Sequence, residues 1–260
     1  MRIAVLLKEV PDTYSDREMN LETGLTDRSG DVVADEVSER AVEAALRIAE
    51  AAGDSAQVEV EILSVSPESS ADSVRRGIAM GASEAYVVSD DALVGADVTL
   101  TAQVLAKLVE KQGYDLVVAG GMSSDGAAGV VAPFVAELLG WPVLTNLTEL
   151  SIDGDSVRAT QASETATAEL SAQLPAVVSV ADGFADPRYP NFKGLMAAKK
   201  KELNTVALTE LGVDPEDFTH PRAIMVDIER RPERERGEII DGNSSAATRL
   251  VDFLESKNLI

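Results

Sequence analysis

Four short apolar runs, each followed by a segment with helical spacing, constrain the fold of this chain most strongly. The runs are IAVLL, VEVEILSVS, EAYVVS and DLVVAGG, which begin at residues 3, 58, 84 and 115. The segments that follow them repeat apolar residues with helical spacing and cover residues 35–52, 70–82, 97–113 and 125–140. Strands that alternate with helices predict a doubly wound, mostly parallel α/β sheet. Continuous apolar runs are typical of strands that helices cover on both faces.

A different pattern follows Trp141, where alternating segments flank the turn signal Asp153-Gly154-Asp155. Such a turn predicts a small β-hairpin region. The last part of the chain is polar and charged, and it ends in an amphipathic segment at 244–260. A polar tether with one amphipathic helix cannot form a core alone, so it must lie along its own domain or a partner. We therefore predict a domain at 1–200 and an extended C-terminal arm at 201–260.

Residues that commonly hold metals are scarce in this sequence. It has no cysteine and a single histidine, His220. This composition argues against a structural zinc, a thiolate-held iron–sulfur cluster, a haem with two protein histidines and a Ser-His-Asp triad. We predict no metal site and no catalytic residue, and any redox chemistry then requires an organic cofactor.

The charge balance is strongly acidic, with 45 acidic and 23 basic residues and a formal net charge of −22. Such a field repels nucleic acid and anionic membrane surfaces, so neither is expected as a partner. Arginine outnumbers lysine by 15 to 8, and aromatic residues make up 4% of the chain. This composition favours a halophile-like surface adapted to high salt, with an ordinary acidic cytosolic protein as the alternative.

The hydropathy of the chain gives no membrane signal, because its apolar runs fall far short of the ~20 residues that a spanning helix needs. The opening MRIAVLLKEV has an apolar run only from Ile3 to Leu7, and no small-residue cleavage site follows it. We interpret it as a buried first strand and not as a signal peptide. We therefore expect no membrane insertion and a cytoplasmic location.

The strongest local signal for a ligand is the stretch that joins the fourth apolar run to its helix. Its small and polar residues are Gly120, Gly121, Ser124, Asp125, Gly126 and Gly129. Backbone N–H groups between a strand and a helix bind phosphate, and glycine lets a ligand approach the backbone closely. Because the spacing matches neither GxGxxG nor a Walker loop, tight packing with Asp125 as a helix N-cap explains the stretch equally well.

Lys8 lies where the first predicted strand ends, shortly before Pro11 stops that strand. Ligands of open α/β folds bind at this carboxyl edge of the sheet, which makes Lys8 a candidate for contact with a ligand. A solvated charge at the edge of the sheet is an equally good explanation of Lys8.

Several stretches together resemble the β subunit of electron transfer flavoproteins. They occur in the family's order and cover nearly the whole chain: LLKEVPDT, SERAVEAALRIAE, GIAMGASEAYVVSD, SSDGAAGVVAPFVAELLG, DPRYPNFKGLMAAKKK and ELGVD. The stretch at 186–201 is the most specific of them. The resemblance implies a Rossmann-like fold of the adenine-nucleotide-binding type.

The resemblance implies an electron carrier subunit rather than an enzyme with its own substrate. In this family the β subunit forms a heterodimer with an α subunit, which holds most of an FAD. The β subunit contributes one wall of the flavin site and buries an AMP. The pair accepts electrons from flavin dehydrogenases, such as the acyl-CoA dehydrogenases of fatty acid oxidation, and passes them to a quinone oxidoreductase or another acceptor.

The resemblance also assigns residues to the two cofactors. The AMP site would contain Leu6, Asp35, Glu36, Val37, Ser38, Val65, Gly120, Gly121, Ser124, Asp125, Gly126, Ala127, Ala128, Gly129 and Val130. Thr13 lies where relatives place a residue near the flavin ring, so it is a candidate for the flavin wall.

The segment 182–201 concentrates aromatic and basic residues in an acidic, aromatic-poor chain. By resemblance, residues 182–190 form a recognition loop that inserts one apolar side chain, here Phe184, into the dehydrogenase. A Phe184 side chain that folds back onto its own sheet is the alternative. The lysines are expected to lead the arm toward the α subunit or to complement a helix dipole. The further partner-binding candidates are Pro187, Arg188, Tyr189, Lys199, Lys200 and Lys201.

Two departures from the family pattern leave the ligand open. Ala128 and Val130 lack the hydroxyl and amide that relatives place near the phosphate, and Asp35-Glu36 replaces a usual Asn-Pro. Backbone N–H groups would still be able to hold the phosphate of AMP. The alternatives are a bifurcating relative with a second FAD in place of AMP, a stand-alone adenine-nucleotide sensor or hydrolase, and an assembly protein without a nucleotide.

Overall fold

The computed structural model describes residues 1–53, 57–234, 236–242 and 244–260. It separates into two compact units, Met1–Val226 and Asp227–Ile260. The predicted boundary after residue 200 lies earlier in the chain than this division. The reason is that residues 204–211 add a strand and a helix to the larger unit.

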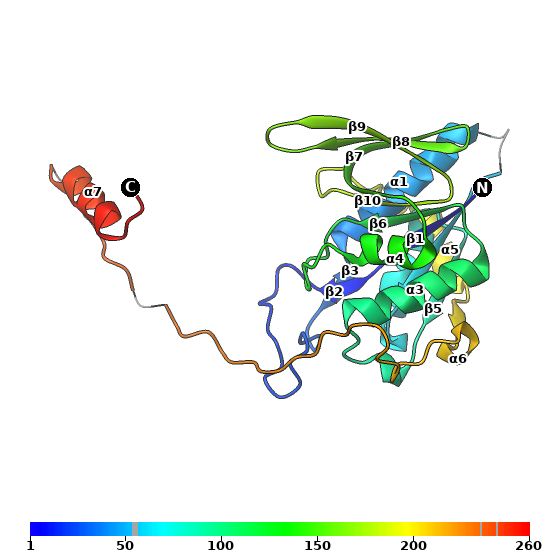
Figure 1. Ribbon diagram of the computed structural model, residues 1–260, viewed down its shortest axis with the longest axis horizontal. Helices are drawn as coiled ribbons and strands as arrows, with labels where there is room; N and C mark the ends of the chain where they lie inside the picture. Colours follow the sequence, from blue (N-terminus) through cyan, green and yellow to red (C-terminus); the bar gives the residue numbers. More distant parts are fainter. Residues whose placement is uncertain (54–56, 235, 243) are drawn as a thin grey trace. The chain divides into compact units, whose positions relative to one another are not determined.

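The larger unit is built on a sheet that has nine strands among the described residues (Figure 1). In spatial order they are β11 (Asn204–Val206), β5 (Glu84–Val88), β4 (Glu59–Val65), β1 (Arg2–Leu6), β6 (Leu116–Gly120), β10 (Ala176–Val180), β7 (Val143–Asp153), β8 (Ser156–Ala162) and β9 (Thr167–Gln173). All neighbours from β11 to β7 are parallel, whereas β7, β8 and β9 pair antiparallel. This confirms the predicted mostly parallel sheet, and the predicted turn at Asp153-Gly154-Asp155 joins β7 to β8.

Helices cover both faces of this sheet. One face carries α1 (Glu36–Ala52), α2 (Ala71–Met80) and α5 (Phe192–Lys200), and the other carries α3 (Val98–Gln112), α4 (Val131–Leu139) and α6 (Leu208–Leu211). Successive residues of a strand point to opposite faces. Ile62 of β4 is therefore buried in the first core and Leu63 in the second. Two short 3₁₀ helices, η2 (Glu68–Ser70) and η3 (Asp91–Leu93), follow β4 and β5.

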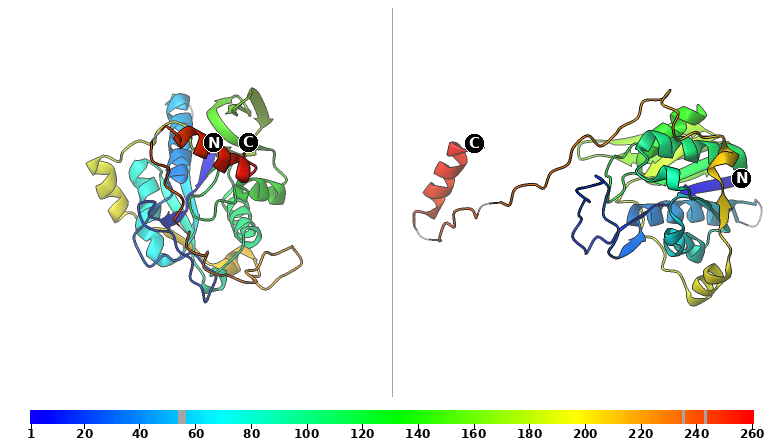
Figure 2. Two further views of the ribbon diagram at one scale, coloured as in Figure 1. Left: turned by 90° about the vertical axis from the view of Figure 1, so that its left-hand side faces the viewer. Right: turned by 90° about the horizontal axis from the view of Figure 1, so that it is seen from below.

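A separate two-stranded sheet follows β1 directly. β2 (Glu9–Pro11) pairs antiparallel with β3 (Val32–Ala34), and the loop of residues 12–31 between them projects from the larger unit, in dark blue in Figure 2. Asp12 N donates to Asp31 O at 2.9 Å, and a bridge joins Met19 to Thr26. The loop is therefore tied by backbone hydrogen bonds at its base and along its length. The sequence pattern did not predict this hairpin.

The smaller unit contains the last helix, α7 (Ala246–Ser256), which confirms the predicted amphipathic segment near the end of the chain. Within the described residues, α7 has no buried side chain. Leu250, Val251 and Phe253 are all exposed apolar side chains of this helix. Among its described residues, the smaller unit thus provides no core of its own for these side chains.

Candidate functional site

The candidate site lies at the carboxyl ends of β1 and β6, where the order of the strands reverses. From β1 the chain moves outward to β4 and β5, and it then returns to place β6 on the other side of β1. Ligands of open α/β sheets bind at such a switch point, because the connections on either side lead to opposite faces. Lys8, the turn of residues 35–38 and the loop of residues 121–130 border this point.

The two glycines at the end of β6 allow the backbone to pack closely. A Cβ atom on Gly120 would lie 2.9 Å from the carbonyl carbon of Val37 in α1. One on Gly121 would lie 2.8 Å from Oδ1 of Asn146 and 2.9 Å from the carbonyl oxygen of Val180. Side chains do not fit at such distances, so these two glycines are explained by packing without any ligand.

The loop of residues 121–130 is not the beginning of a helix. The helix α4 begins at Val131, and Asp125 accepts a hydrogen bond from Gly126 N (2.6 Å) instead of capping α4. Ala127 and Gly129 have positive φ angles of 48° and 67°. These left-handed residues turn the backbone out of the helical path. The helical segment predicted from residue 125, and the explanation of Asp125 as an N-cap, are therefore wrong.

Asp125 is the centre of a group of charged side chains. Its carboxylate accepts hydrogen bonds from Lys8 Nζ on one oxygen and from Arg28 Nη2 on the other, each at 2.7 Å. The Asp125 side chain is only 1% exposed. Burial by itself would raise the pKa of the carboxyl, but the bonds from Arg28 and Lys8 outweigh burial and hold the pKa far below its usual range. Lys8 is thus an ion-pairing residue of the site and not a free charge at the edge.

A second carboxyl, that of Asp35, is buried beside this group. Asp35 N donates to the carbonyl oxygen of Lys8 at 2.9 Å, and its Oδ1 accepts a long hydrogen bond of 3.4 Å from Ser124 N. Burial raises the pKa of Asp35, although the bond from Ser124 opposes this effect. Among the described residues, the buried Ser124 Oγ has no hydrogen-bond partner. An orphaned hydroxyl at a ligand edge fits a site that a bound polar group would complete.

The structure brings most of the predicted nucleotide-site residues to this one edge. Leu6 ends β1, Val65 ends the neighbouring β4 and Gly120 ends β6. Asp35 is the N-cap of α1, and the helix opens with Glu36, Val37 and Ser38. The remaining residues lie on the loop of residues 121–130. Ala128 is exposed on this loop, and Thr13 is exposed on the loop of residues 12–31. The flavin-wall role of Thr13 stays a prediction.

Sequence reasoning missed two cations of the site, Arg17 and Arg28. Both lie on the loop of residues 12–31, and Arg17 donates to the carbonyl oxygen of Ser124 while Arg28 binds Asp125. No motif spacing marks either arginine. The sequence offered only a weaker signal than a motif. Two cations occur shortly after the carboxyl end of β1, in a chain that is otherwise strongly acidic.

Comparisons with known proteins agree on one family. The family model described as the electron transfer flavoprotein domain matches residues 23–211. The chain is 38% identical to the electron transfer flavoprotein subunit beta of Mycobacterium leprae over 99% of both chains. It is 36% identical to that of Mycobacterium tuberculosis over 99% of both chains. The Bacillus subtilis subunit is 31% identical over 99% of this chain and 98% of its own.

The chain belongs to the electron transfer flavoprotein β-subunit family. The resemblance carried by LLKEVPDT, DPRYPNFKGLMAAKKK and the other stretches is thereby confirmed. Membership also gives the chain a role in flavin-related electron transfer.

The predicted recognition segment differs from expectation at Phe184. Phe184 is only 6% exposed and belongs to the first hydrophobic core, so it is not an exposed anchor in this structure. The chain turns tightly after β10, with Phe184 N donating to Ala181 O at 3.0 Å. The aromatic residues of this segment that face solvent are Tyr189, 90% exposed, and Phe192, 78% exposed.

Arg188 was also predicted to bind a partner, but in this β subunit it binds residues of its own domain. Its Nε donates to Glu43 Oε2 at 2.7 Å, its backbone N donates to the same oxygen at 3.1 Å, and its guanidinium also pairs with Glu50. The carboxyls of Glu50 and Glu43 raise the pKa of Arg188. The arginine thus fixes the segment onto α1.

Of the remaining predicted partner residues, one forms an ion pair within the chain and others are exposed to solvent. Lys201 pairs with Glu84 of β5, whereas Lys199 and Lys200 are exposed in the last turn of α5. Cations there complement the helix dipole, so this explanation is supported for Lys199 and Lys200. Pro187 is half-buried.

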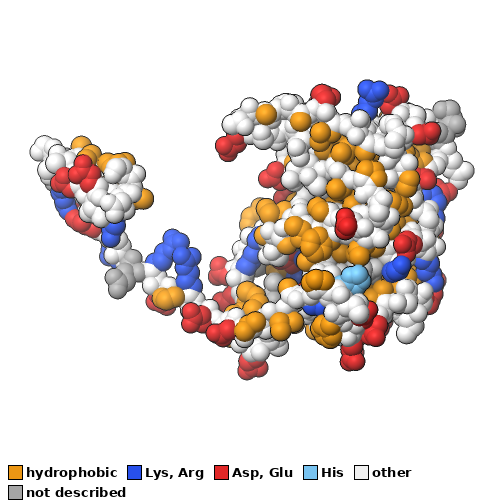
Figure 3. Space-filling view, viewed as in Figure 1, with side chains coloured by type: hydrophobic (Ala, Val, Ile, Leu, Met, Phe, Trp, Pro, Cys, Tyr) orange, Lys and Arg blue, Asp and Glu red, His pale blue; other side chains and the backbone are white. Residues whose placement is uncertain are grey.

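A hollow lies on the α3 side of the sheet. It has a volume of about 250 Å³ and is lined by Lys107, Leu138, Asp217 and His220, among others. Figure 3 shows the single histidine at the surface of this face. Within the described part of the chain, no group of acidic and histidine side chains has the arrangement of a metal site, and no helix is long and apolar enough to cross a membrane.

Proposed function

We propose that this chain pairs with an electron transfer flavoprotein α subunit and that the pair shares one FAD. The heterodimer would accept electrons from flavin dehydrogenases, such as acyl-CoA dehydrogenases, and pass them to a quinone oxidoreductase or another acceptor. The observation that carries this proposal is the match to electron transfer flavoprotein β subunits along almost the whole chain. The predicted cytoplasmic location stays a prediction.

We propose that the carboxyl edge of β1 and β6 holds an AMP. Support comes from the cations around Asp125, from the orphaned Ser124 hydroxyl, and from the open backbone at Gly126, where a Cβ atom would meet nothing closer than 3.8 Å. The missing hydroxyl and amide at Ala128 and Val130 keep a second FAD, and hence electron bifurcation, as the alternative. Nucleotide extracted from the purified pair distinguishes AMP from a second FAD.

Exposed apolar side chains support a partner that covers this edge. Tyr14, Met19 and Leu21 on the loop of residues 12–31, and Met122 on the neighbouring loop, are all exposed. Such side chains clustered on polar loops are typical of protein interfaces. We propose that the α subunit and its flavin lie against these loops, with Thr13 in the flavin wall.

The C-terminal arm supplies the second surface for the α subunit in this proposal. Leu250, Val251 and Phe253 are exposed on α7, and the described residues of the smaller unit provide no core for them. An amphipathic helix without a core of its own is stabilised when its apolar face enters a groove on a partner. We therefore propose that residues 227–260 bind along the α subunit.

Electron transfer of this kind requires no acid or base from the chain. The FAD would supply the redox chemistry, and the protein would set the distance and orientation between flavins and their surroundings. Exposed Tyr189 and Phe192 are the side chains that we propose for contact with the dehydrogenase, because Phe184 is buried. A small apolar contact suits a partner that must be released quickly.

The test is co-expression of the chain with the α subunit of the same organism. We expect a one-to-one complex by light scattering, the absorbance of one bound FAD, and reduction of that FAD by an acyl-CoA dehydrogenase. A matched variant that ends at Val226 should pair more weakly while its larger unit stays folded. A chain that remains monomeric beside the α subunit and hydrolyses ATP would contradict the proposal and favour the stand-alone nucleotide protein.

A further inference from the structure

The loop of residues 12–31 is fixed in place by contacts that the family resemblance did not predict. Its base is closed by the bond from Asp12 N to Asp31 O, and Met225 packs where a Cβ on Gly24 would lie, at 2.5 Å. Gly24 has a φ angle of 70°, which residues with a side chain rarely adopt. Both this φ angle and the close approach of Met225 therefore favour glycine at this position. These contacts support a defined loop that can carry a functional side chain.

Arg17 and Arg28 of this loop both reach the candidate nucleotide site, and Arg28 is the one that binds the Asp125 carboxylate. It shares Asp125 with Lys8, and each cation uses one oxygen of the carboxylate. The carboxylate is 1% exposed, whereas the side chains of Lys8 and Arg28 are 45% and 36% exposed. The negative charge is therefore buried beneath two cations that still face solvent.

The donor capacity of the two cations exceeds what Asp125 accepts. An ammonium group has three N–H donors and a guanidinium has five. Within the described residues, the structure records one bond from Lys8 Nζ and one from the Arg28 guanidinium, both to Asp125. Donors remain on both groups for an anion that arrives from the solvent side.

The charge of the whole chain favours such a local cation pair at the site of an anionic ligand. The net charge of −22 repels a phosphate, and the buried carboxyl of Asp35 lies within electrostatic range of the same site. Ala128 and Val130 offer no polar side chain to the phosphate. Backbone N–H groups can bind the phosphate but carry only partial charges, whereas side-chain cations supply full positive charges that neutralise it.

We propose that Lys8 and Arg28 form the phosphate-binding pair of the nucleotide site, with Asp125 as the buried carboxylate that positions both. This inference rests on the proposed nucleotide site and adds the residues that recognise the anionic end of the ligand. Arg28 and Lys8 contact the phosphate, whereas Asp125 acts through them. The ligand class is a nucleotide with a terminal phosphate, and a nucleoside without phosphate should not use the pair.

The experiment compares AMP with adenosine by calorimetric titration of the nucleotide-free full chain, alone and with its α subunit. Arg28→Gln should weaken AMP binding about 10- to 100-fold, the cost of a lost charged hydrogen bond, and leave adenosine binding unchanged. Arg28→Lys should restore part of the AMP affinity because it keeps the charge. Arg158→Gln is the matched control, since Arg158 pairs with Asp153 on the exposed hairpin.

Each result of this titration decides the inference. Equal weakening of AMP and adenosine by Arg28→Gln indicates a merely structural role and overturns it, as does unchanged AMP binding. Wild-type chain that binds neither compound overturns both this inference and the proposed AMP site. Light scattering measures pairing with the α subunit separately. A chain that does not pair contradicts the wider proposed function, and this outcome is distinct from a failure of Lys8 and Arg28 to bind phosphate.

Discussion

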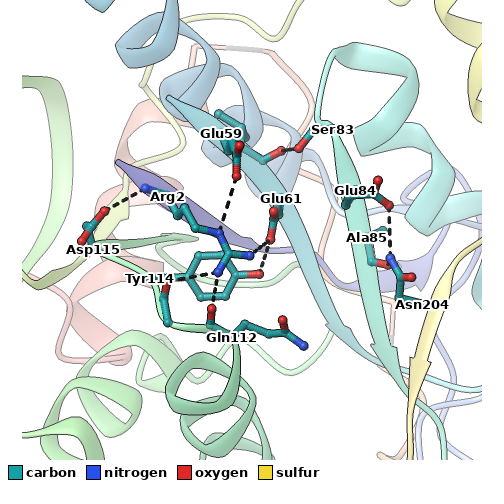
Figure 4. Close-up of polar contacts among 12 residues, drawn as sticks. Arg2, Glu59, Glu61, Ser83, Glu84, Ala85, Gln112, Tyr114, Asp115 and Asn204 are labelled. Atoms are coloured by element: carbon teal, nitrogen blue, oxygen red, sulfur yellow. Dashed lines mark hydrogen bonds and ion pairs between the residues drawn. The ribbon is translucent and has the colours of Figure 1, made fainter. Parts of the chain in front are cut away.

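At the residue scale, Glu61 on the central strand β4 is a buried charge outside the candidate site. Its Oε2 accepts hydrogen bonds from Arg2 Nη2 at 2.8 Å and from the Tyr114 hydroxyl at 2.6 Å (Figure 4). The Arg2 guanidinium also lies over the Tyr114 ring, with Cζ 4.8 Å from its centroid. Burial and the bond to Glu61 raise the pKa of Tyr114, so this hydroxyl remains a donor. The group closes the amino end of the sheet.

The Glu61 group yields a stability prediction. Arg2→Gln leaves the buried carboxylate without its cation, and because Arg2 is partly exposed we expect a loss of roughly 2 kcal/mol in the free energy of unfolding. Urea unfolding followed by circular dichroism measures this loss. Arg158→Gln, which breaks an exposed pair with Asp153, should change stability by less than about 1 kcal/mol. Equal effects of the two substitutions would show that Glu61 does not depend on Arg2.

At the element scale, two arginines fasten the segment after β10 to the helix α1. Arg40 donates to the carbonyl oxygen of Phe184 and pairs with Asp186, while Arg188 pairs with Glu43 and Glu50. The next element, α5, begins after Asn191, whose side chain caps it by accepting from Gly194 N at 2.8 Å. Tyr189 is therefore exposed between these two fixed points, and Phe192 is exposed in the first turn of α5.

This arrangement separates the roles of two phenylalanines. Phe192→Ala removes an exposed ring, so we expect unchanged stability and at least a roughly tenfold slower reduction by the dehydrogenase. Phe184→Ala removes a buried ring and should cost about 3 kcal/mol or more in unfolding free energy. Stopped-flow reduction and urea unfolding measure the two effects. If the heterodimer with Phe184→Ala is as stable as wild type but its FAD is reduced slowly by the dehydrogenase, the original prediction of an anchor at Phe184 is supported instead.

The elements that sequence alone predicted are those whose signal is local. Continuous apolar runs such as IAVLL indicate strands buried on both faces. Gly154 indicates its turn from the adjacent residues alone, independently of any contact with a distant segment. Residues 125–130 were predicted as the start of a helix because helical spacing continues through residue 140, whereas their path depends on left-handed residues at 127 and 129. The burial of Phe184 and the bond from Arg28 to Asp125 depend on contacts between distant segments, which no local pattern encodes.

At the scale of the whole molecule, a net charge of −22 opposes the compact state through repulsion among surface carboxylates. Many of the recorded ion pairs involve exposed groups, such as Lys107 with Glu110 and Lys111 with Glu210. Exposed pairs contribute little to stability, so they offset this repulsion only in part. Dissolved salt is the remaining agent that can reduce it.

We therefore expect the midpoint of thermal unfolding to rise when KCl is increased from about 0.05 M to about 1 M, where the screening length falls to roughly 3 Å. Screening weakens both attraction and repulsion, but repulsion dominates in a chain with 45 acidic and 23 basic residues. Scanning calorimetry measures the midpoint. Asp155→Asn with Glu164→Gln removes two exposed charges and should raise the low-salt midpoint while reducing its dependence on KCl. A midpoint that falls with KCl would show that paired charges, and not the net charge, control the stability of this chain.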